Sequence, residues 1–134
     1  MPAQQTPKIV QLDLGPLPVD LINRATGLEL EPGNAFLSIN AQKHAAKRHP
    51  LDYSRGLPHV AAVIANPMYL GDDFNNRGKI ELVARIAALG SALLVAVEIT
   101  TDHHGRYNVT SFYPIAQWKI DSRRYKGHLL IANR

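Results

Sequence analysis

The feature that most constrains this fold is a change to strand-like periodicity at Lys79. From there to Ile86, apolar and polar side chains alternate with a period of two, as in a β-strand with one buried face. Residues 91–100 are strongly apolar and predict a second, central strand, and residues 106–113 predict a third. Because a short polar loop at residues 101–106 joins the last two, we expect an antiparallel meander of three or four strands.

Helices are predicted on both sides of this meander in the chain. The expected elements are a strand at 8–14, an extended segment at 35–39, helices at 18–25, 41–49, 58–66 and 115–126, and an edge strand at 128–131. Residues 51–56 and 68–78 are expected to be loops. Ile115 and Trp118 are expected to pack together on the sheet. This order of elements predicts an α+β fold.

Length and composition exclude several classes of protein. The 134 residues predict one domain over residues 1–134, with residues 1–7 as a disordered lead. The absence of cysteine excludes a disulfide framework, a cysteine metal site and a thiol nucleophile. No apolar run is long enough for a transmembrane helix, and the N-terminus lacks a signal-peptide segment. We therefore expect no membrane partner, and either a reducing compartment or a protein that works in more than one compartment.

The net charge of +4 is distributed unevenly. Lys8 and Arg24 are the only basic residues before Lys43, whereas four acidic residues lie in the same stretch. The basic excess therefore belongs to the part of the chain that begins at Lys43. Such a field attracts polyanions, above all nucleic acid.

The segment from Ser38 to Pro50 carries the strongest chemical signal. Asn40 is expected to cap a helix that Pro50 ends. The segment holds two histidines and an arginine, namely His44, Arg48 and His49. Histidine moves protons near neutral pH and arginine binds phosphate through paired hydrogen bonds, so this set suits phosphate chemistry. The alternative is a solvated basic face with one histidine at the helix C-terminus.

The geometry of a regular helix makes a further prediction about the two histidines. His44 and Arg48 are four residues apart and share a face. His49 would lie roughly 140° around the helix from His44, so the two imidazoles would not stack. The turn before a proline is often distorted, which leaves this angle soft.

The first strand of the meander adds Lys79, Glu81 and Arg85 on one face. If the histidine helix lies beside that face, one cleft holds the groups that cleave RNA without a metal ion. A base then takes the 2′-hydroxyl proton, an acid protonates the leaving 5′-oxygen, and cations stabilise the phosphate. The alternative is an ordinary exposed sheet face with cross-strand pairs.

Several short motifs, in order, resemble the phage-type branch of the barnase/EndoU/colicin/RelE-like nucleases. They are His44-x3-Arg48-His49-Pro50, Leu57-Pro58 with Asn66-Pro67, Gly78-Lys79-Ile80-Glu81-Leu82-Val83, and Ser111-Phe112-Tyr113-Pro114-Ile115. The resemblance covers roughly residues 38–128 and implies N-terminal helices on a mostly antiparallel four-stranded sheet. It also implies a metal-independent ribonuclease that uses no cofactor.

Carried over by position, the resemblance assigns site residues. The catalytic candidates are His44, Arg48, His49, Lys79, Glu81, Thr110, Ser111 and Tyr113. The RNA-binding candidates, taken from the basic helix, the strand and the basic C-terminal segment, are Lys43, Lys47, Arg85, Lys119, Arg123 and Arg124. No metal ligand is assigned.

The sequence therefore predicts an endoribonuclease. By resemblance it would be an antibacterial toxin domain that cuts RNA, tRNA first among candidates, in the cytoplasm of a target cell, with a cognate immunity protein as partner. The alternative is a nucleic-acid-binding module without activity, belonging to a phage or bacterial protein, in which the same basic residues only contact phosphates.

Overall fold

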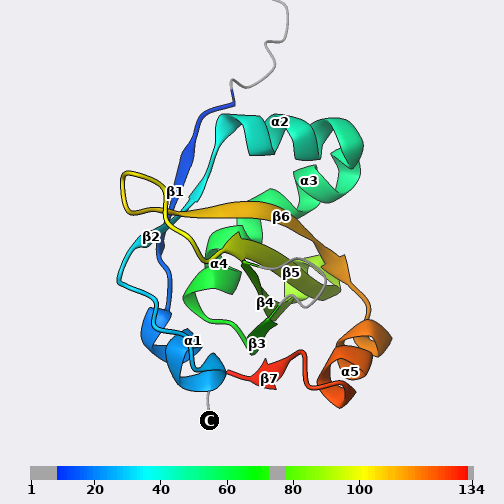
Figure 1. Cartoon of the computed structure of the whole chain (residues 1–134). Coiled ribbons are helices and arrows are strands. Elements are labelled where there is room, and N and C mark those ends of the chain that lie inside the picture. The colour runs from blue at the N-terminus through cyan, green and yellow to red at the C-terminus, as the bar shows by residue number, and fades with distance from the viewer. Residues whose placement is uncertain (1–8, 73–77, 133–134) are drawn as a thin grey trace, which may run out of the picture.

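The computed structural model describes residues 9–72 and 78–132 and has an α+β fold (Figure 1). The predicted disordered lead at residues 1–7 lies outside the described residues. The helices are α1 (Val19–Thr26), α2 (Ile39–Arg48), α3 (Pro50–Gly56), α4 (Val60–Ala65) and α5 (Gln117–Tyr125). The strands are β1 (Leu12–Pro16), β2 (Asn34–Leu37), β3 (Tyr69–Asp72), β4 (Lys79–Ile86), β5 (Ser91–Glu98), β6 (Tyr107–Ile115) and β7 (Leu130–Ile131).

The predicted meander is confirmed and forms the middle of the sheet. β4 pairs antiparallel with β5 along its whole length, from Lys79 opposite Glu98 to Ile86 opposite Ser91. β6 pairs antiparallel with the other edge of β5. The short loop between β5 and β6 also lies where the sequence predicts it.

The predicted number of four strands is wrong. Over the described residues the sheet has seven strands in the order β1-β2-β6-β5-β4-β3-β7. One reason is that β2 pairs in parallel with β6, which brings β1 into the sheet as well. The other is that Tyr69–Asp72, predicted as loop, forms β3, because Leu70 is buried there and the strand pairs with both β4 and β7.

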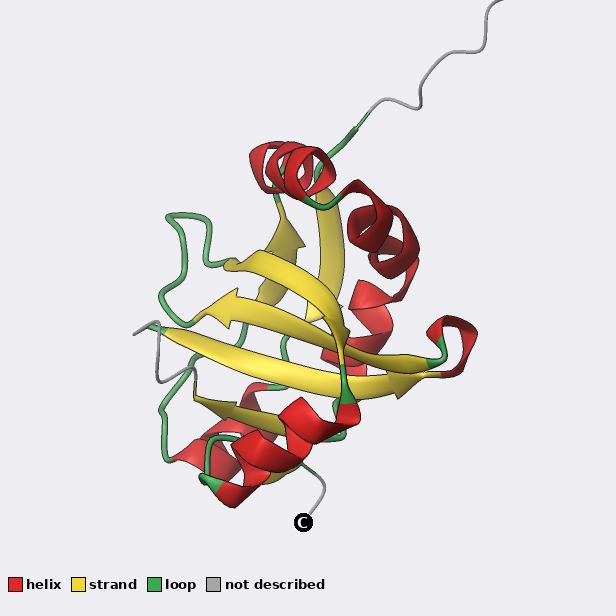
Figure 2. Ribbon diagram, turned by 90° about the vertical axis from the view of Figure 1, so that its right-hand side faces the viewer, coloured by secondary structure: helices red, strands yellow, loops and turns green. Residues whose placement is uncertain are grey.

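Two apolar clusters cover the two faces of this sheet, and Figure 2 shows helices on both sides of the strands. The larger cluster joins Leu82 and Leu93 of the sheet to the buried side chains of α1 and α4. The smaller cluster joins Val83 and Leu94 to Ile120 of α5. Alternate residues of β4 and β5 thus enter different clusters, as the period-two pattern requires.

The helices differ from the prediction at three places, two at helix ends and one in side-chain packing. Ser38, not Asn40, caps α2, since its Oγ accepts a hydrogen bond from the Ala41 N–H at 3.1 Å. Pro50 does more than end α2: it occupies the first turn of α3, so the loop predicted at residues 51–56 is helical. Trp118, predicted to pack on the sheet, is 68% exposed.

Candidate active site

The helix that carries the histidines is fixed to the sheet by Gln42. This side chain is buried, and its Nε2 donates to the carbonyl oxygens of Val10 at 2.6 Å and Leu37 at 3.3 Å. Its Oε1 accepts a hydrogen bond from the Tyr53 hydroxyl of α3 at 3.1 Å. One buried amide therefore joins α2, α3, the end of β2 and the segment just before β1, and it determines where the exposed side of α2 lies.

His49 occupies the corner between α2 and α3. Its backbone leaves the helical region, with φ −140° and ψ 67°. Its N–H donates to the Ala45 carbonyl at 2.9 Å, and its own carbonyl accepts from the Tyr53 N–H at 2.8 Å. The residue thus closes one helix and opens the next. The angle of roughly 140° expected between His44 and His49 in a regular helix therefore does not apply. Instead, the corner lets both imidazoles line one pocket.

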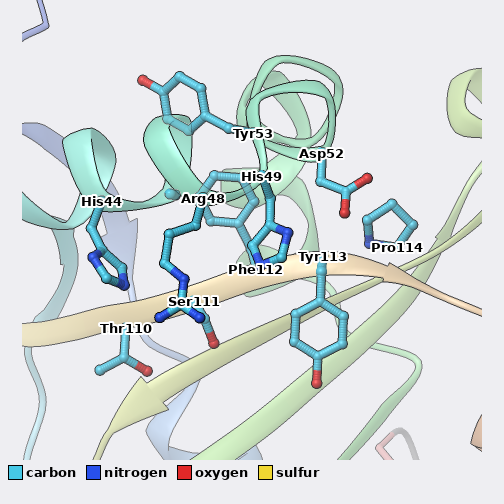
Figure 3. Close-up of a pocket in the computed structure, with 11 residues that line it drawn as sticks. His44, Arg48, His49, Asp52, Tyr53, Thr110, Ser111, Phe112, Tyr113 and Pro114 are labelled. Atoms are coloured by element: carbon cyan, nitrogen blue, oxygen red, sulfur yellow. The ribbon is translucent and has the colours of Figure 1, made fainter.

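A pocket of about 440 Å³ lies between α2, α3 and β6. It is lined by His44, Ala45, Arg48, His49, Asp52, Tyr53, Thr110, Ser111, Phe112, Tyr113 and Pro114. Figure 3 shows the side chains of His44, Arg48 and His49 directed from the helices toward β6, while the Tyr53 hydroxyl points away from it. The three helix residues are exposed, so a large substrate can reach them.

A β-bulge shapes the strand side of this pocket. Ala96 of β5 pairs with Ser111 but Val97 pairs with Val109, so Thr110 is an extra residue in β6. The bulge lets Val109 and Phe112 both enter the core, while Thr110 and Ser111 line the pocket. Bulges of this kind often redirect side chains next to active sites.

The floor of the pocket is held by close packing of α3 on β6. The rings of Tyr53 and Phe112 are tilted, with centroids 6.1 Å apart. Gly56 lies so close that an added Cβ would be 3.1 Å from the Phe112 ring and 3.3 Å from Leu93. A larger residue at the end of α3 would therefore push the helix away from the strand.

The structure brings six of the eight catalytic candidates together and leaves two outside the pocket. Lys79 lies at the start of β4, opposite Glu98. Glu81 is 6% exposed because α5 covers this part of the sheet, and its Oε1 accepts from Arg123 Nε at 3.2 Å. Its β5 neighbour, Ala96, pairs on the other side with Ser111, so Glu81 is two strands away, about 10 Å by strand spacing.

The basic candidates occupy two separate helices and one strand. Lys43 and Lys47 are exposed on α2, near the pocket helix residues. On α5, the Lys119 Nζ lies 5.5 Å from the centre of the Trp118 ring and the Arg124 Cζ lies 5.0 Å from that of Tyr69. The remaining two are already bonded within the protein: Arg123 to Glu81, and the Arg85 guanidinium to the Gln117 side chain of α5.

Sequence reasoning missed Asp52 and Tyr53, both of which line the pocket. They were missed because Pro50 was interpreted only as the end of a helix. A proline in the first turn followed by an acidic residue is also the pattern of a helix start, and here Asp52 lies in the first turn of α3. That pattern, applied after His49, would have found α3 and both residues.

Within residues 9–72 and 78–132, no three histidine, cysteine, aspartate or glutamate side chains gather as a metal ion would require. No helix in this part of the chain is long and apolar enough to cross a membrane.

Comparison with protein families shows that this chain belongs to a class of nucleases. The family model described as phage-Barnase-EndoU-ColicinE5/D-RelE like nuclease3 matches residues 15–122, and the chain belongs to that family. The match confirms the resemblance found in the sequence and includes every residue that lines the pocket. No curated protein and no solved structure matches the chain.

Proposed function

We propose that this nuclease is a metal-independent endoribonuclease whose catalytic centre is the pocket between α2, α3 and β6. The observation that carries the proposal is the meeting of His44, Arg48 and His49 with the hydroxyl-bearing strand in one pocket. A pair of imidazoles can supply both a base and an acid near neutral pH, and the guanidinium can supply the cation for the phosphate.

The proposed reaction places the scissile phosphate between α2 and β6. One imidazole takes the proton of the 2′-hydroxyl, and the 2′-oxygen attacks phosphorus while the bond to the 5′-oxygen breaks. The other imidazole donates a proton to that leaving oxygen. The products are a 2′,3′-cyclic phosphate and a 5′-hydroxyl end. Because the nucleophile belongs to the substrate, this step uses only protein side chains.

Arg48 and the strand residues stabilise the phosphate in this scheme. Arg48 binds the non-bridging oxygens through two parallel hydrogen bonds, which strengthen as charge develops. The Ser111 hydroxyl is exposed and can donate to the same oxygens, and so can Thr110, which now donates weakly to the Ala96 carbonyl at 3.4 Å. Tyr113 forms the adjoining wall of the pocket.

Lys79 and Glu81 have a different place in this proposal. Since Glu81 is bonded to Arg123 and lies two strands from Ser111, we infer that the pair helps to hold α5 on the sheet. Lys79 and Arg85 are on the same face and extend the basic surface for the RNA backbone. Lys43 and Lys47 do the same on α2.

The biological setting belongs to the same proposal and rests on family membership. We propose a toxin domain that cuts tRNA in the cytoplasm of a target cell, together with an immunity protein that covers the pocket. An exposed catalytic helix suits both partners, since tRNA and a blocking protein are large. Growth arrest on expression in bacteria, relieved by His49→Ala, would support the toxin role, and unimpaired growth with wild-type protein would contradict it.

The test uses the purified chain with total tRNA, a long single-stranded RNA and a DNA strand of the same sequence, all in EDTA. The proposal expects RNA to be cut, DNA to remain intact, and the products to end in cyclic phosphate and 5′-hydroxyl groups. DNA cutting, or 5′-phosphate ends, would refute attack by the 2′-hydroxyl. Intact RNA with a salt-sensitive gel shift would instead favour the binding module without activity.

A further inference from the structure

Helix α5 carries two large aromatic side chains that the fold leaves in solvent. Trp118 is 68% exposed and Tyr125 is 93% exposed. They are seven residues apart, so they lie on one side of the helix with a rise of about 10 Å between them. Such a pair on a nine-residue helix is unusual, since large aromatic residues normally contribute to a core.

The opposite side of α5 already fixes the helix to the sheet. Ile120 is buried in the smaller apolar cluster. Arg123 bonds to Glu81 on β4, and Arg124 lies over the Tyr69 ring on β3. These contacts anchor α5 without help from the two aromatic side chains, which are therefore available to something outside the chain.

Two lysines lie along one flank of the aromatic side and indicate the chemistry of that partner. Lys119 lies beside the Trp118 ring, and Lys126 follows Tyr125 directly. Within Gln117–Tyr125 the one acidic residue, Asp121, accepts a hydrogen bond from Gln117 Nε2 at 2.9 Å. Exposed aromatic rings among cations match single-stranded nucleic acid, because the rings stack on bases while the cations contact phosphates.

The aromatic side is also close to the pocket along the chain. Pro114 lines the pocket, β6 ends at Ile115, and Trp118 is four residues beyond Pro114. Four residues span at most about 14 Å. Figure 1 shows α2 and α3 over β6 and α5 just past the end of that strand. An RNA strand that leaves the pocket along β6 thus reaches α5 within a few nucleotides.

We propose that Trp118 and Tyr125 form a stacking platform for unpaired nucleotides that flank the scissile phosphate. This inference rests on the proposed ribonuclease function and adds a substrate class to it: RNA that is single-stranded beside the cut. The platform contributes to substrate binding and leaves the chemical step to the pocket.

The chain offers a direct probe, because Trp118 is its single tryptophan. We would titrate His49→Ala, which should leave RNA uncut, with a mixed-sequence single-stranded 12-mer. Tryptophan emission and fluorescence anisotropy of the labelled RNA would be followed together. We expect tryptophan emission to fall in step with binding of the single-stranded RNA. A duplex RNA of the same length should change the emission less.

Steady-state kinetics of RNA cleavage, with His49 left intact, give the second readout. Trp118→Ala should raise KM roughly fivefold or more with kcat nearly unchanged, and Trp118→Phe should restore most of the loss by keeping a stacking ring. Leu51→Ala is a matched control, since Leu51 is 67% exposed but outside the lining of the pocket.

The outcomes separate this inference from the proposed function. RNA that binds without altering Trp118 emission, from a protein that cuts RNA, would overturn the platform and leave the ribonuclease standing. Quenching by RNA in a protein that cuts none would overturn the ribonuclease and keep α5 as an RNA-binding surface. A concentration-dependent shift of emission without RNA would show that a second copy covers α5, and would also overturn the platform.

Discussion

Replacing Gln42 by Met tests how the pocket helix is held in place. The two side chains have similar length and volume, so the substitution creates no sizeable cavity and removes only the amide. Three hydrogen bonds are lost, to the carbonyls of Val10 and Leu37 and from the hydroxyl of Tyr53. Gln42 itself does not line the pocket, although its partner Tyr53 does, so the change acts first on the attachment of α2.

The expected loss can be worked from these contacts. Each hydrogen bond contributes about 0.5–1.5 kcal/mol net. Val10 is 52% exposed and the Tyr53 hydroxyl is only partly buried, so water can replace two of the lost partners. We therefore expect a loss of about 2–3 kcal/mol in the free energy of unfolding. For 134 residues this lowers Tm by about 7–11 °C.

The assay is reversible unfolding in urea, followed by circular dichroism, with Tyr53→Phe as the partner variant. Tyr53→Phe removes one of the three bonds and should cost about 1 kcal/mol. The double variant should cost less than the two single changes together, because the two residues share one bond. If Gln42→Met cost under about 0.5 kcal/mol, the claim that this amide positions α2 would be refuted.

Two further predictions concern the frame around the site. Gly71→Ala should destabilise the fold by about 3 kcal/mol in urea unfolding, because the new Cβ would lie 1.7 Å from the His128 backbone oxygen; a loss below about 1 kcal/mol would contradict this packing. The pKa of Asp102 lies below its ordinary 3.8, because the carboxylate accepts hydrogen bonds from the Arg106 backbone N–H, the His104 N–H and the Arg106 side chain. A lowered pKa gives stability that is present above the unfolded value and lost as pH falls through the folded one. Asp102→Asn should thus be less stable than wild type at pH 7, with the difference vanishing in acid, whereas a difference independent of pH would contradict the assignment.

Local patterns in the sequence predict those elements that depend on neighbouring residues alone. The alternation at Lys79–Ile86 specifies β4, and the apolar run after it specifies β5, because side-chain periodicity and burial are properties of each segment. The helix predicted at 18–25 is confirmed as α1, and Gly27, with φ 78°, follows its last residue, since this left-handed conformation suits glycine. The family resemblance was carried by such local motifs too.

Pairings between distant segments escaped prediction. The parallel pairing of β2 with β6 joins residues about 70 positions apart in the sequence. The residues of Asn34–Leu37 alone do not indicate which strand they pair with. The bulge at Thr110 is likewise a property of two strands together. The sequence predicts Glu81 in a cleft beside the histidine helix, or else on an exposed sheet face. In the structure α5 covers it, and only the tertiary fold reveals the bond to Arg123.

The site was predictable to the extent that it lies on one short segment. His44, Arg48 and His49 were found because they stand within six residues of each other. Asp52 was missed, since the prediction placed a loop after Pro50 where the structure has α3. The strand that faces these residues could be assigned only by resemblance, because its approach to α2 depends on contacts such as that of Gly56 with Phe112.

The measurement that tests the central claim most directly is the single-turnover rate of RNA cleavage in EDTA by four proteins. They are the wild type, His44→Ala, His49→Ala and His103→Ala, the last an exposed histidine in the β5–β6 loop, outside the pocket lining. We predict that each pocket variant loses about 10²–10⁴-fold in rate, as expected for a general acid or base, while keeping its fold. His103→Ala should match the wild type. Full activity in both pocket variants would show that this pocket is not the catalytic centre.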